Sequence, residues 1–402
     1  MKIRLLFVSL SLFTMVQAQD LPAADTIEPL APYNFILGTN AIGGKYKFTS
    51  ESKLYEQAQR IRAMGSNVLK ISLGPNSPKS YDLPINGKPA TTLDLFLSSP
   101  EYKRVFDMDF KYLFSWVHTN TGINWRNGIS PEQEKILYDE MFQFASYLLK
   151  TYNNSHKTFL IGNWEGDWLL LPDYNRNRSP SKEQILNMTQ WFRIRQRAID
   201  DAKKASASKN VALYYYIEVN LVLKGMKGES CVASEVLPAV NPDLVSYSSY
   251  EAIKNRNYGE KKNTLTQVFG YLEKQLKPRN GLPFSRRVFI GEYGYQASSS
   301  NPESFRKQYH ETKDIMKISL ELNLPFALHW QMYNNEYGPD GESKQMSLID
   351  ESGKKMPLYH LHKNYYDHMN RFLTQYNQLN KRYPSDDLFR KEALQFLEAD
   401  RD

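Results

Sequence analysis

Cysteine, long apolar runs and blocks of like charge are what this 402-residue sequence has least of. Cys231 is the only cysteine, so no intramolecular disulfide can form and stability must come from a large buried core. After residue 18, no run approaches the roughly 18 consecutive apolar residues that cross a bilayer, so we expect no membrane contact. The formal charge of +7 is spread over both signs, which argues against a nucleic-acid partner.

The first 18 residues differ from the rest. Lys2 and Arg4 precede a short apolar run, and Val16-Gln17-Ala18 follows it as a small-x-small cleavage pattern. This arrangement predicts a secretory signal and therefore a secreted protein, extracellular or periplasmic. We expect the catalytic unit to span residues 19–380, a C-terminal helical extension to span 381–402, and the protein to be a monomer.

Eight short apolar runs alternate with segments that have room for a helix. The runs are near-continuous in aliphatic, β-branched and aromatic residues, as strands covered on both faces of a parallel sheet are. Eight β-α units in a chain of this length predict an α/β fold, a single-domain (β/α)8 TIM barrel with long loops on its C-terminal face. The predicted strands are 33–39, 67–73, 112–118, 158–163, 211–217, 243–247, 287–291 and 326–330.

A doubly wound open sheet is the alternative fold. It would usually carry a glycine-rich phosphate loop after its first strand, but "GTNAIGGKYKF" (38–48) does not match G-x-G-x-x-G. Helix start signals support the barrel, since Ser130 and Ser181 each precede a Gln by three residues, as in a capping box. The proline-rich segment 74–106 is predicted to be an extended loop on the rim of the site.

Aromatic, amide and acidic residues gather where these strands end, and that face of a (β/α)8 barrel carries the chemistry. Aromatic rings stack on the C–H face of a sugar, whereas amides and carboxylates hydrogen-bond its hydroxyl groups. The sequence therefore predicts a poly- or oligosaccharide partner. The predicted substrate-binding residues are Asn40, Trp116, His118, Asn163, Trp164, Asp167, Trp168, Glu218, Tyr247, Trp330 and Gln331.

Glu165 and Glu292 are the candidate catalytic residues. They close the fourth and seventh strands, which lie almost opposite each other around an eight-stranded barrel. Glycoside hydrolysis needs two carboxyl groups that flank the scissile bond, about 5 Å apart for retention of configuration and about 6.5–9.5 Å apart for inversion.

Three segments carry a resemblance to a known family. "FLIGNWEGDW" (159–168), "VFIGEYGY" (288–295) and "FALHWQMYNNE" (326–336) resemble the clan-A glycoside hydrolases, the retaining (β/α)8 enzymes that include cellulase-like and mannanase-like barrels. The resemblance implies Glu292 as nucleophile and Glu165 as acid/base. It also implies Tyr247 as the partner of the nucleophile and Trp330 as a sugar platform.

The sequence departs from the clan at one position, because Trp164 stands between Asn163 and Glu165, where the clan has Asn directly before Glu. Extended geometry would put Asn163 and Glu165 on the same side of the strand. We further expect Trp164 and Trp168 to raise the pKa of Glu165 by desolvation, and polar partners such as Tyr247 to keep Glu292 ionised.

The predicted function is hydrolysis of β-glycosidic bonds of a polysaccharide, with a β-glucan as one candidate, by two Glu residues and without cofactor or metal. A carbohydrate-binding barrel that has lost catalysis is the main alternative. A metal-dependent hydrolase is a further one. It finds little support, because His360 and His362 stand two residues apart and face different sides of a helix.

Overall fold

The computed structural model describes residues 29–339 and 341–400, so the predicted secretory signal lies outside the described residues. Eight parallel strands form a closed barrel in sequence order, and the last strand pairs with the first. This confirms the predicted (β/α)8 fold. The strands are β1 (Leu37–Asn40), β2 (Val68–Leu73), β3 (Tyr112–Val117), β4 (Thr158–Gly162), β5 (Ala212–Val219), β6 (Leu244–Ser248), β7 (Val288–Tyr293) and β8 (Ala327–His329).

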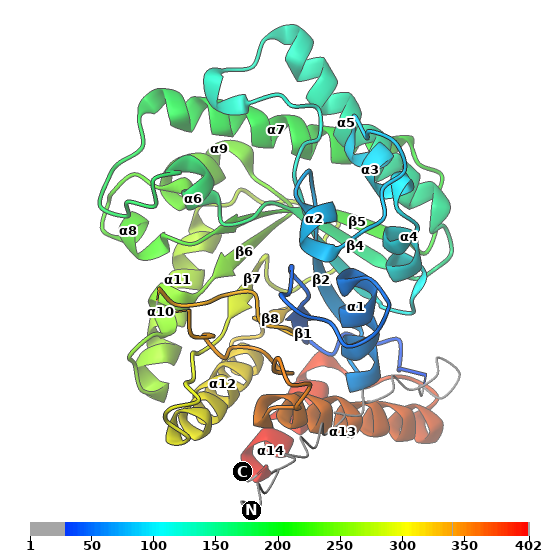
Figure 1. The fold of residues 1–402 in the computed structure, drawn as a ribbon, viewed down its shortest axis with the longest axis vertical. Coiled ribbons are helices and arrows are strands. Elements are labelled where there is room, and N and C mark those ends of the chain that lie inside the picture. Colours follow the sequence, from blue (N-terminus) through cyan, green and yellow to red (C-terminus); the bar gives the residue numbers. More distant parts are fainter. Residues whose placement is uncertain (1–28, 340, 401–402) are drawn as a thin grey trace, which may run out of the picture.

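Helices surround the strands, with α5 and α7 on one side of the molecule and α12, α13 and α14 on the other (Figure 1). The longer helices are α1 (Lys53–Met64), α5 (Pro131–Thr151), α7 (Lys182–Ala205), α11 (Tyr258–Lys274), α12 (Glu303–Glu321), α13 (Pro357–Asn380) and α14 (Asp386–Ala399). The shorter ones are α6 (Gly166–Leu170), α8 (Val222–Met226), α9 (Leu237–Val240), α10 (Tyr250–Ile253), η2 (Trp125–Asn127) and η3 (Val232–Val236).

The helix starts follow from the capping chemistry of the sequence. The Ser130 side chain accepts a hydrogen bond from the Gln133 backbone N–H, and the Gln133 side chain accepts one from the Ser130 N–H. Ser181 and Gln184 repeat this pattern at the start of α7. Both capping boxes are confirmed, and they fix where the two longest helices on that side of the barrel begin.

The segment 74–106 corrects a prediction. It is not an extended loop, because it folds into α2 (Ser77–Tyr81), α3 (Thr92–Ser98) and α4 (Pro100–Asp107). Its prolines do not prevent this: Pro78 and Pro100 each lie in the first helical turn, where a missing N–H removes no helical hydrogen bond. Only the start of the segment borders the mouth of the barrel.

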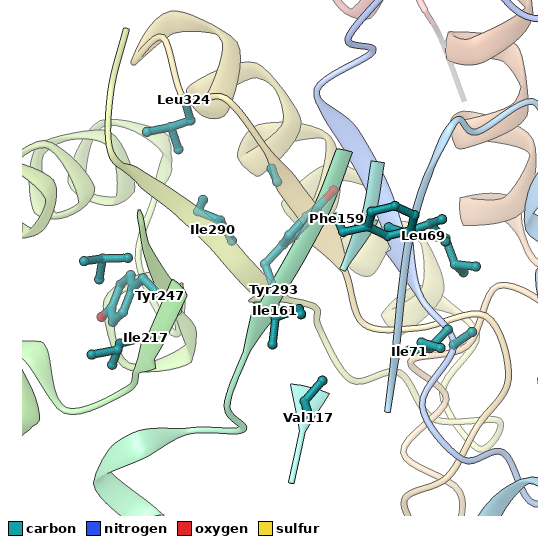
Figure 2. Close-up of a cluster of buried hydrophobic side chains, with 14 of the residues drawn as sticks. Leu69, Ile71, Val117, Phe159, Ile161, Ile217, Tyr247, Ile290, Tyr293 and Leu324 are labelled. Carbon is teal, nitrogen blue, oxygen red and sulfur yellow. The ribbon is translucent and has the colours of Figure 1, made fainter. Parts of the chain in front are cut away.

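Side chains alternate along each strand between the inside of the barrel and the surrounding helices. The inside is filled by a separate cluster of buried rings and aliphatic groups. The residues between them point outward into the larger core under the helices, which Figure 2 draws in part. On β3, for example, Tyr112, Phe114 and Trp116 belong to the inner cluster, whereas Leu113 and Val117 belong to the outer core.

The chain ends on α14, which packs against α12 and α13. Arg390 donates hydrogen bonds to the carbonyls of Leu320 and Leu324 and so ties the last helix to the end of α12. The predicted division of the chain at residues 18 and 380 stays a prediction. Within the described residues, no helix combines the length and the apolar character that crossing a bilayer requires.

Candidate active site

The ends of the strands enclose a cleft of about 1200 Å³. Its floor and walls bring together seven of the side chains that were predicted from the sequence. They are Trp116, His118, Trp164, Glu165, Trp168, Glu292 and Trp330. Both candidate catalytic carboxyls therefore face one cavity, as strands on opposite sides of a barrel allow.

Glu292 reaches the cleft because β7 is irregular. Tyr247 pairs with Ile290, but the next residue of β6, Ser248, pairs with Glu292, so Gly291 is an extra residue in the register. Without this bulge, Glu292 would share the outward face with Ile290. A Cβ on Gly291 would lie 1.7 Å from Ser246 Oγ, so only glycine leaves room for the packing at this bulge.

Glu165 follows β4 at the start of α6, where the chain has left the extended conformation (φ 5°, ψ 86°). The Asn163 side chain is held differently. Its Oδ1 accepts from the Glu218 N–H and its Nδ2 donates to the Glu218 carbonyl, so the amide extends the β4–β5 ladder by one step. Asn163 and Glu165 do not share one strand face as expected, and the Glu165 carboxylate instead accepts a 2.6 Å hydrogen bond from Ser248 Oγ.

A buried charge network lies beneath the two carboxyls. Lys70, on β2, places its Nζ 2.7 Å from Glu218 Oε2 and 3.8 Å from Glu292 Oε1. Glu218 also accepts from Trp116 Nε1 at 3.1 Å and from Ser246 Oγ at 2.7 Å. Glu218 is therefore a fully buried partner of other side chains and does not line the cleft, and its predicted contact with substrate stays a prediction. Lys70 was not predicted as a site residue, although it is the one charged residue of the otherwise apolar strand β2.

The carboxyl groups are electrostatically coupled. Burial raises the pKa of Glu165 to about 7, the Glu218 charge adds to that rise, and the Ser248 hydrogen bond opposes it. Burial also raises the pKa of Glu292 well above its ordinary value, with Glu218 adding to the rise and Lys70 opposing it. The expectation of a desolvated Glu165 is met. The expectation that polar partners keep the pKa of Glu292 low is not met, because the carboxyl groups of Glu165, Glu218 and Glu292 share the single buried ammonium group of Lys70.

Tyr250, rather than the predicted Tyr247, is the tyrosine of the sixth strand region that contacts the candidate nucleophile. Its hydroxyl donates to Glu292 Oε2 at 3.4 Å. Tyr247 lies on the outward face of β6, donates to Glu251, and belongs to the apolar layer that also holds Ile217 (Figure 2). The prediction for Tyr247 is wrong because strand alternation directs Ser246 and Ser248 inward and Tyr247 outward.

Three further predicted substrate contacts are buried structural groups. Asp167 accepts hydrogen bonds from the backbone N–H groups of Asn220, Leu221 and Val232 and so joins the loops that follow β4 and β5. The side-chain amides of Asn40 and Gln331 are also buried: Asn40 donates to the His329 carbonyl, and Gln331 accepts from the Ile42 N–H. Like Asn163, these groups hold the rim in place and do not face the cleft.

Four indole rings line the cleft. Trp116 and Trp330 lie 5.8 Å apart between ring centroids, and Trp330 Nε1 donates to Glu336. Trp164 and Trp168 line the same cleft from the segment after β4 that carries Glu165. His118 lines both this main cleft and an adjoining space of about 810 Å³, which we call the side arm. Burial lowers the pKa of His118 to about 4, so the ring is neutral at pH 7 and can exchange hydrogen bonds with hydroxyl groups.

No family model matches the sequence, and a search of curated proteins gives no match. Solved structures do match. A β-glucuronidase from Bacteroides uniformis aligns over 83% of this chain and 35% of its own, with 11% identity and a TM-score of 0.54. A family 39 glycoside hydrolase from Bacteroides cellulosilyticus aligns over 83% of this chain and 63% of its own, with 12% identity and a TM-score of 0.51.

The shared feature is the fold. A second B. uniformis β-glucuronidase structure, covalently bound to a cyclophellitol-6-carboxylate aziridine, aligns over 85% of this chain at 12% identity with a TM-score of 0.54. This chain spans about a third of the length of both β-glucuronidases. At these identities the likeness establishes the (β/α)8 barrel and leaves the chemistry to be argued from the site.

Among residues 29–339 and 341–400, no three His, Cys, Asp or Glu side chains come together in a way that could hold a metal ion. His362 is buried and hydrogen-bonded to the Leu358 carbonyl at 2.8 Å within α13, so it is part of the core. Cys231 is also buried.

Proposed function

We propose that this protein is a secreted retaining glycoside hydrolase that cleaves β-glycosidic bonds of a polysaccharide. The observation that carries the proposal is that the half-buried carboxyl group of Glu165 and the buried carboxyl group of Glu292 face one aromatic-lined cleft at the ends of β4 and β7. Glycoside hydrolysis by double displacement needs two such groups, one to attack the anomeric carbon and one to protonate the leaving oxygen.

The assignment of roles sets a requirement on the proton that the two carboxyl groups share. Two coupled carboxyl groups carry one proton between them over a wide pH range, and attack requires that this proton reside on Glu165. Lys70 Nζ lies 3.8 Å from Glu292 and favours its ionised form. Glu165, with a pKa of about 7, is then protonated when substrate binds and can later accept a proton from water.

The size and lining of the cleft support an oligomeric substrate. A volume of about 1200 Å³ exceeds the roughly 300–1,000 Å³ of most small-molecule pockets. The indole rings of Trp116, Trp164, Trp168 and Trp330 offer planar surfaces for sugar rings. The cleft therefore has room for several subsites, which favours a polysaccharide over a single small glycoside.

The deciding experiment measures reducing-end release from a panel of polysaccharides, β-glucans included, by the wild type and by Glu292→Ala. We expect release by the wild type and a loss of at least about 1,000-fold in the variant, as for removal of other covalent nucleophiles. Glu183→Ala, an exposed carboxyl at the start of α7, is the matched control and should keep full activity. Equal release by Glu292→Ala would contradict the assignment of the nucleophile.

Azide distinguishes the two roles on an aryl glycoside with a good leaving group. In Glu292→Ala, azide can occupy the space of the missing carboxylate and give a glycosyl azide of inverted configuration. In Glu165→Ala, the first step needs no acid on such a substrate, and azide should trap the glycosyl-enzyme with net retention. The opposite stereochemical pattern would exchange the two assignments.

A carbohydrate-binding barrel without catalysis is the second candidate. The observation that favours it is the position of Asn163, whose amide is bonded to the Glu218 backbone and is not free for a sugar hydroxyl. This candidate predicts glycan binding without product, unchanged by Glu292→Gln. A cyclophellitol-type aziridine, the reagent class that labels the β-glucuronidase neighbour, offers a direct test, because covalent labelling requires a working nucleophile.

A further inference from the structure

The cleft continues beyond Trp164 and His118 into a side arm of about 810 Å³. The two spaces share the lining residues Ile42, Ser72, His118, Trp164 and Asn335, so they are joined. The loops that follow β1, β2, β3 and β4 build this arm, whereas the loops that follow β4 to β8 build most of the main cleft. The arm is therefore a distinct end of the same binding surface.

The two spaces differ in charge. Six Glu side chains and four cations line the main cleft. Among the described residues, no Asp or Glu lines the arm, although four cationic side chains do: Lys45, Lys53, Lys79 and Arg126. We call these four residues the basic arm. Lys53 pairs with Asp82 at 3.2 Å, but Lys45 and Lys79 are exposed and have no ion pair in the described part of the chain.

Arg126 is the most firmly held member of the basic arm. It is half-buried, its Nε and one terminal nitrogen donate to the Leu169 carbonyl at 3.1 and 2.8 Å, and its guanidinium lies 4.6 Å from the Trp125 ring centroid. A neutral carbonyl satisfies two of its donors and leaves its charge without a carboxylate. A guanidinium fixed in this way presents its remaining donors in a geometry that suits a carboxylate or a sulfate.

We propose that the basic arm binds an anionic substituent of the substrate, the carboxylate of a uronic acid or a sulfate ester, beside the bond to be cleaved. The inference rests on the proposed function, because it names the class of glycan that this site takes. A wall with one sign of charge concentrates ligands of the opposite sign. A neutral glycan would gain hydrogen bonds but no charge pairing from these cations, whereas an acidic glycan would gain both.

The test separates binding from turnover. The Glu292→Ala protein is run through native gels that contain polymannuronate, a β-linked uronate polymer, a sulfated galactan, or the polymannuronate after chemical reduction of its carboxyl groups to alcohols. We expect retardation by at least one acidic polymer, none by the reduced polymer, and weaker retardation as salt rises. Retardation by the uronate alone identifies a carboxylate, and retardation by the sulfated galactan alone identifies a sulfate.

A charge-matched pair of variants locates the effect. Lys45→Gln/Lys79→Gln should weaken binding of the acidic polymer by about three- to tenfold, as expected for two exposed charge pairs. Lys150→Gln/Lys274→Gln removes the same charge from exposed helix positions outside the cleft and should leave binding unchanged. Equal losses in the two double variants, or no retardation by either acidic polymer, would overturn the proposal.

Turnover is measured in parallel. If the wild type cleaves neutral glycans and fails to bind acidic ones, the proposed function stands and the basic arm does not select an anion. If acidic polymers bind through Lys45 and Lys79 but no polymer is cleaved, the inference stands and the hydrolase proposal fails.

Discussion

At the scale of single residues, the chemistry depends on groups that place one proton among neighbouring carboxyls. Ser248 donates its hydroxyl to Glu165 at 2.6 Å, which stabilises the ionised form of this candidate acid. Lys70 does the same for Glu292 from the other side of the barrel. Neither residue was assigned a role from the sequence alone, yet each influences which carboxyl group is ionised.

Ser248→Ala tests the first of these contacts. The alanine removes a hydrogen bond to the carboxylate, so the pKa of Glu165 should rise above about 7. A hydrogen bond worth about 0.5–1.5 kcal/mol corresponds to a shift of about 0.4–1.1 pH units. We expect the upper limb of the kcat/KM profile to move to higher pH by this amount. Ser248→Thr keeps the hydroxyl and should restore the profile, and an unmoved limb in Ser248→Ala would refute the assignment.

Lys70→Met tests the second contact. It leaves Glu218 and Glu292 buried without a counter-charge, which typically costs about 3–5 kcal/mol of stability. We expect a lower urea midpoint and a loss of activity near neutral pH, because Glu292 would hold the proton. Lys70→Arg retains the charge and should lie between the variant and the wild type in stability. Lys70→Met with wild-type stability and activity would show that the network is dispensable.

At the scale of elements, strand alternation explains which parts of the site could be predicted. Side chains of a β-strand alternate with a period of two residues, which places Lys70, Ser246 and Ser248 inside the barrel and Tyr247 outside. The inward or outward direction of these side chains could therefore be predicted from the sequence. The bulge at Gly291 could not be predicted, because it depends on the register between β6 and β7. The role of Asn163 could not be predicted either. Its polar side chain indicated a contact with substrate, but its amide continues the hydrogen-bond ladder between β4 and β5.

The fold was predictable for a related reason. Eight apolar runs correspond to the eight strands within a few residues, because strands buried on both faces must be apolar throughout. The segment 74–106 was harder. Its prolines indicated a loop, but a proline in the first turn of a helix is compatible with helix formation, as Pro78 and Pro100 show.

Gly291→Ala tests the bulge as an element. The new methyl group would lie 1.7 Å from Ser246 Oγ and 2.6 Å from Glu218 Oε2, so the buried Ser246 and Glu218 side chains must shift and their mutual hydrogen bond is disturbed. We expect a loss of about 3 kcal/mol in urea unfolding. Gly270→Ala is the matched control in α11, where a Cβ meets nothing within 4 Å, and it should stabilise the protein by about 0.5–1 kcal/mol. A Gly291→Ala protein as stable as the wild type would contradict the tight bulge.

At the scale of the whole molecule, buried histidines link stability to pH. His329 on β8 and His362 on α13 lie with ring centroids 5.0 Å apart in the core. Burial lowers the pKa of His362 from 6.5 to about 4 and that of His329 well below 6.5. Between pH 6.5 and pH 4 the two imidazole rings are therefore protonated in the unfolded chain and neutral in the folded chain. Because the unfolded state binds more protons, the free energy of unfolding falls as pH drops from 6.5 towards 4.

His362→Leu isolates this contribution from that of Glu165, whose raised pKa acts in the opposite direction. The difference in unfolding free energy between the variant and the wild type should change in favour of the variant by about 3 kcal/mol between pH 6.5 and pH 4. His156→Leu, at an exposed turn, should show no such change. Parallel stability curves for His362→Leu and the wild type would contradict the burial of a neutral histidine.

The pairing of β1 with β8 joins residues about 290 positions apart. During synthesis at roughly 5–20 residues per second, β1 waits roughly 15–60 seconds for this partner. In that interval its open edge can recruit strands of other nascent chains.

A chain that ends at residue 325 should therefore sediment as aggregate where the full chain stays soluble, and a soluble, cooperatively unfolding fragment would contradict this. The barrel, and with it the active site, therefore cannot close before β8 has been synthesised, so translation sets the earliest time at which the site can form.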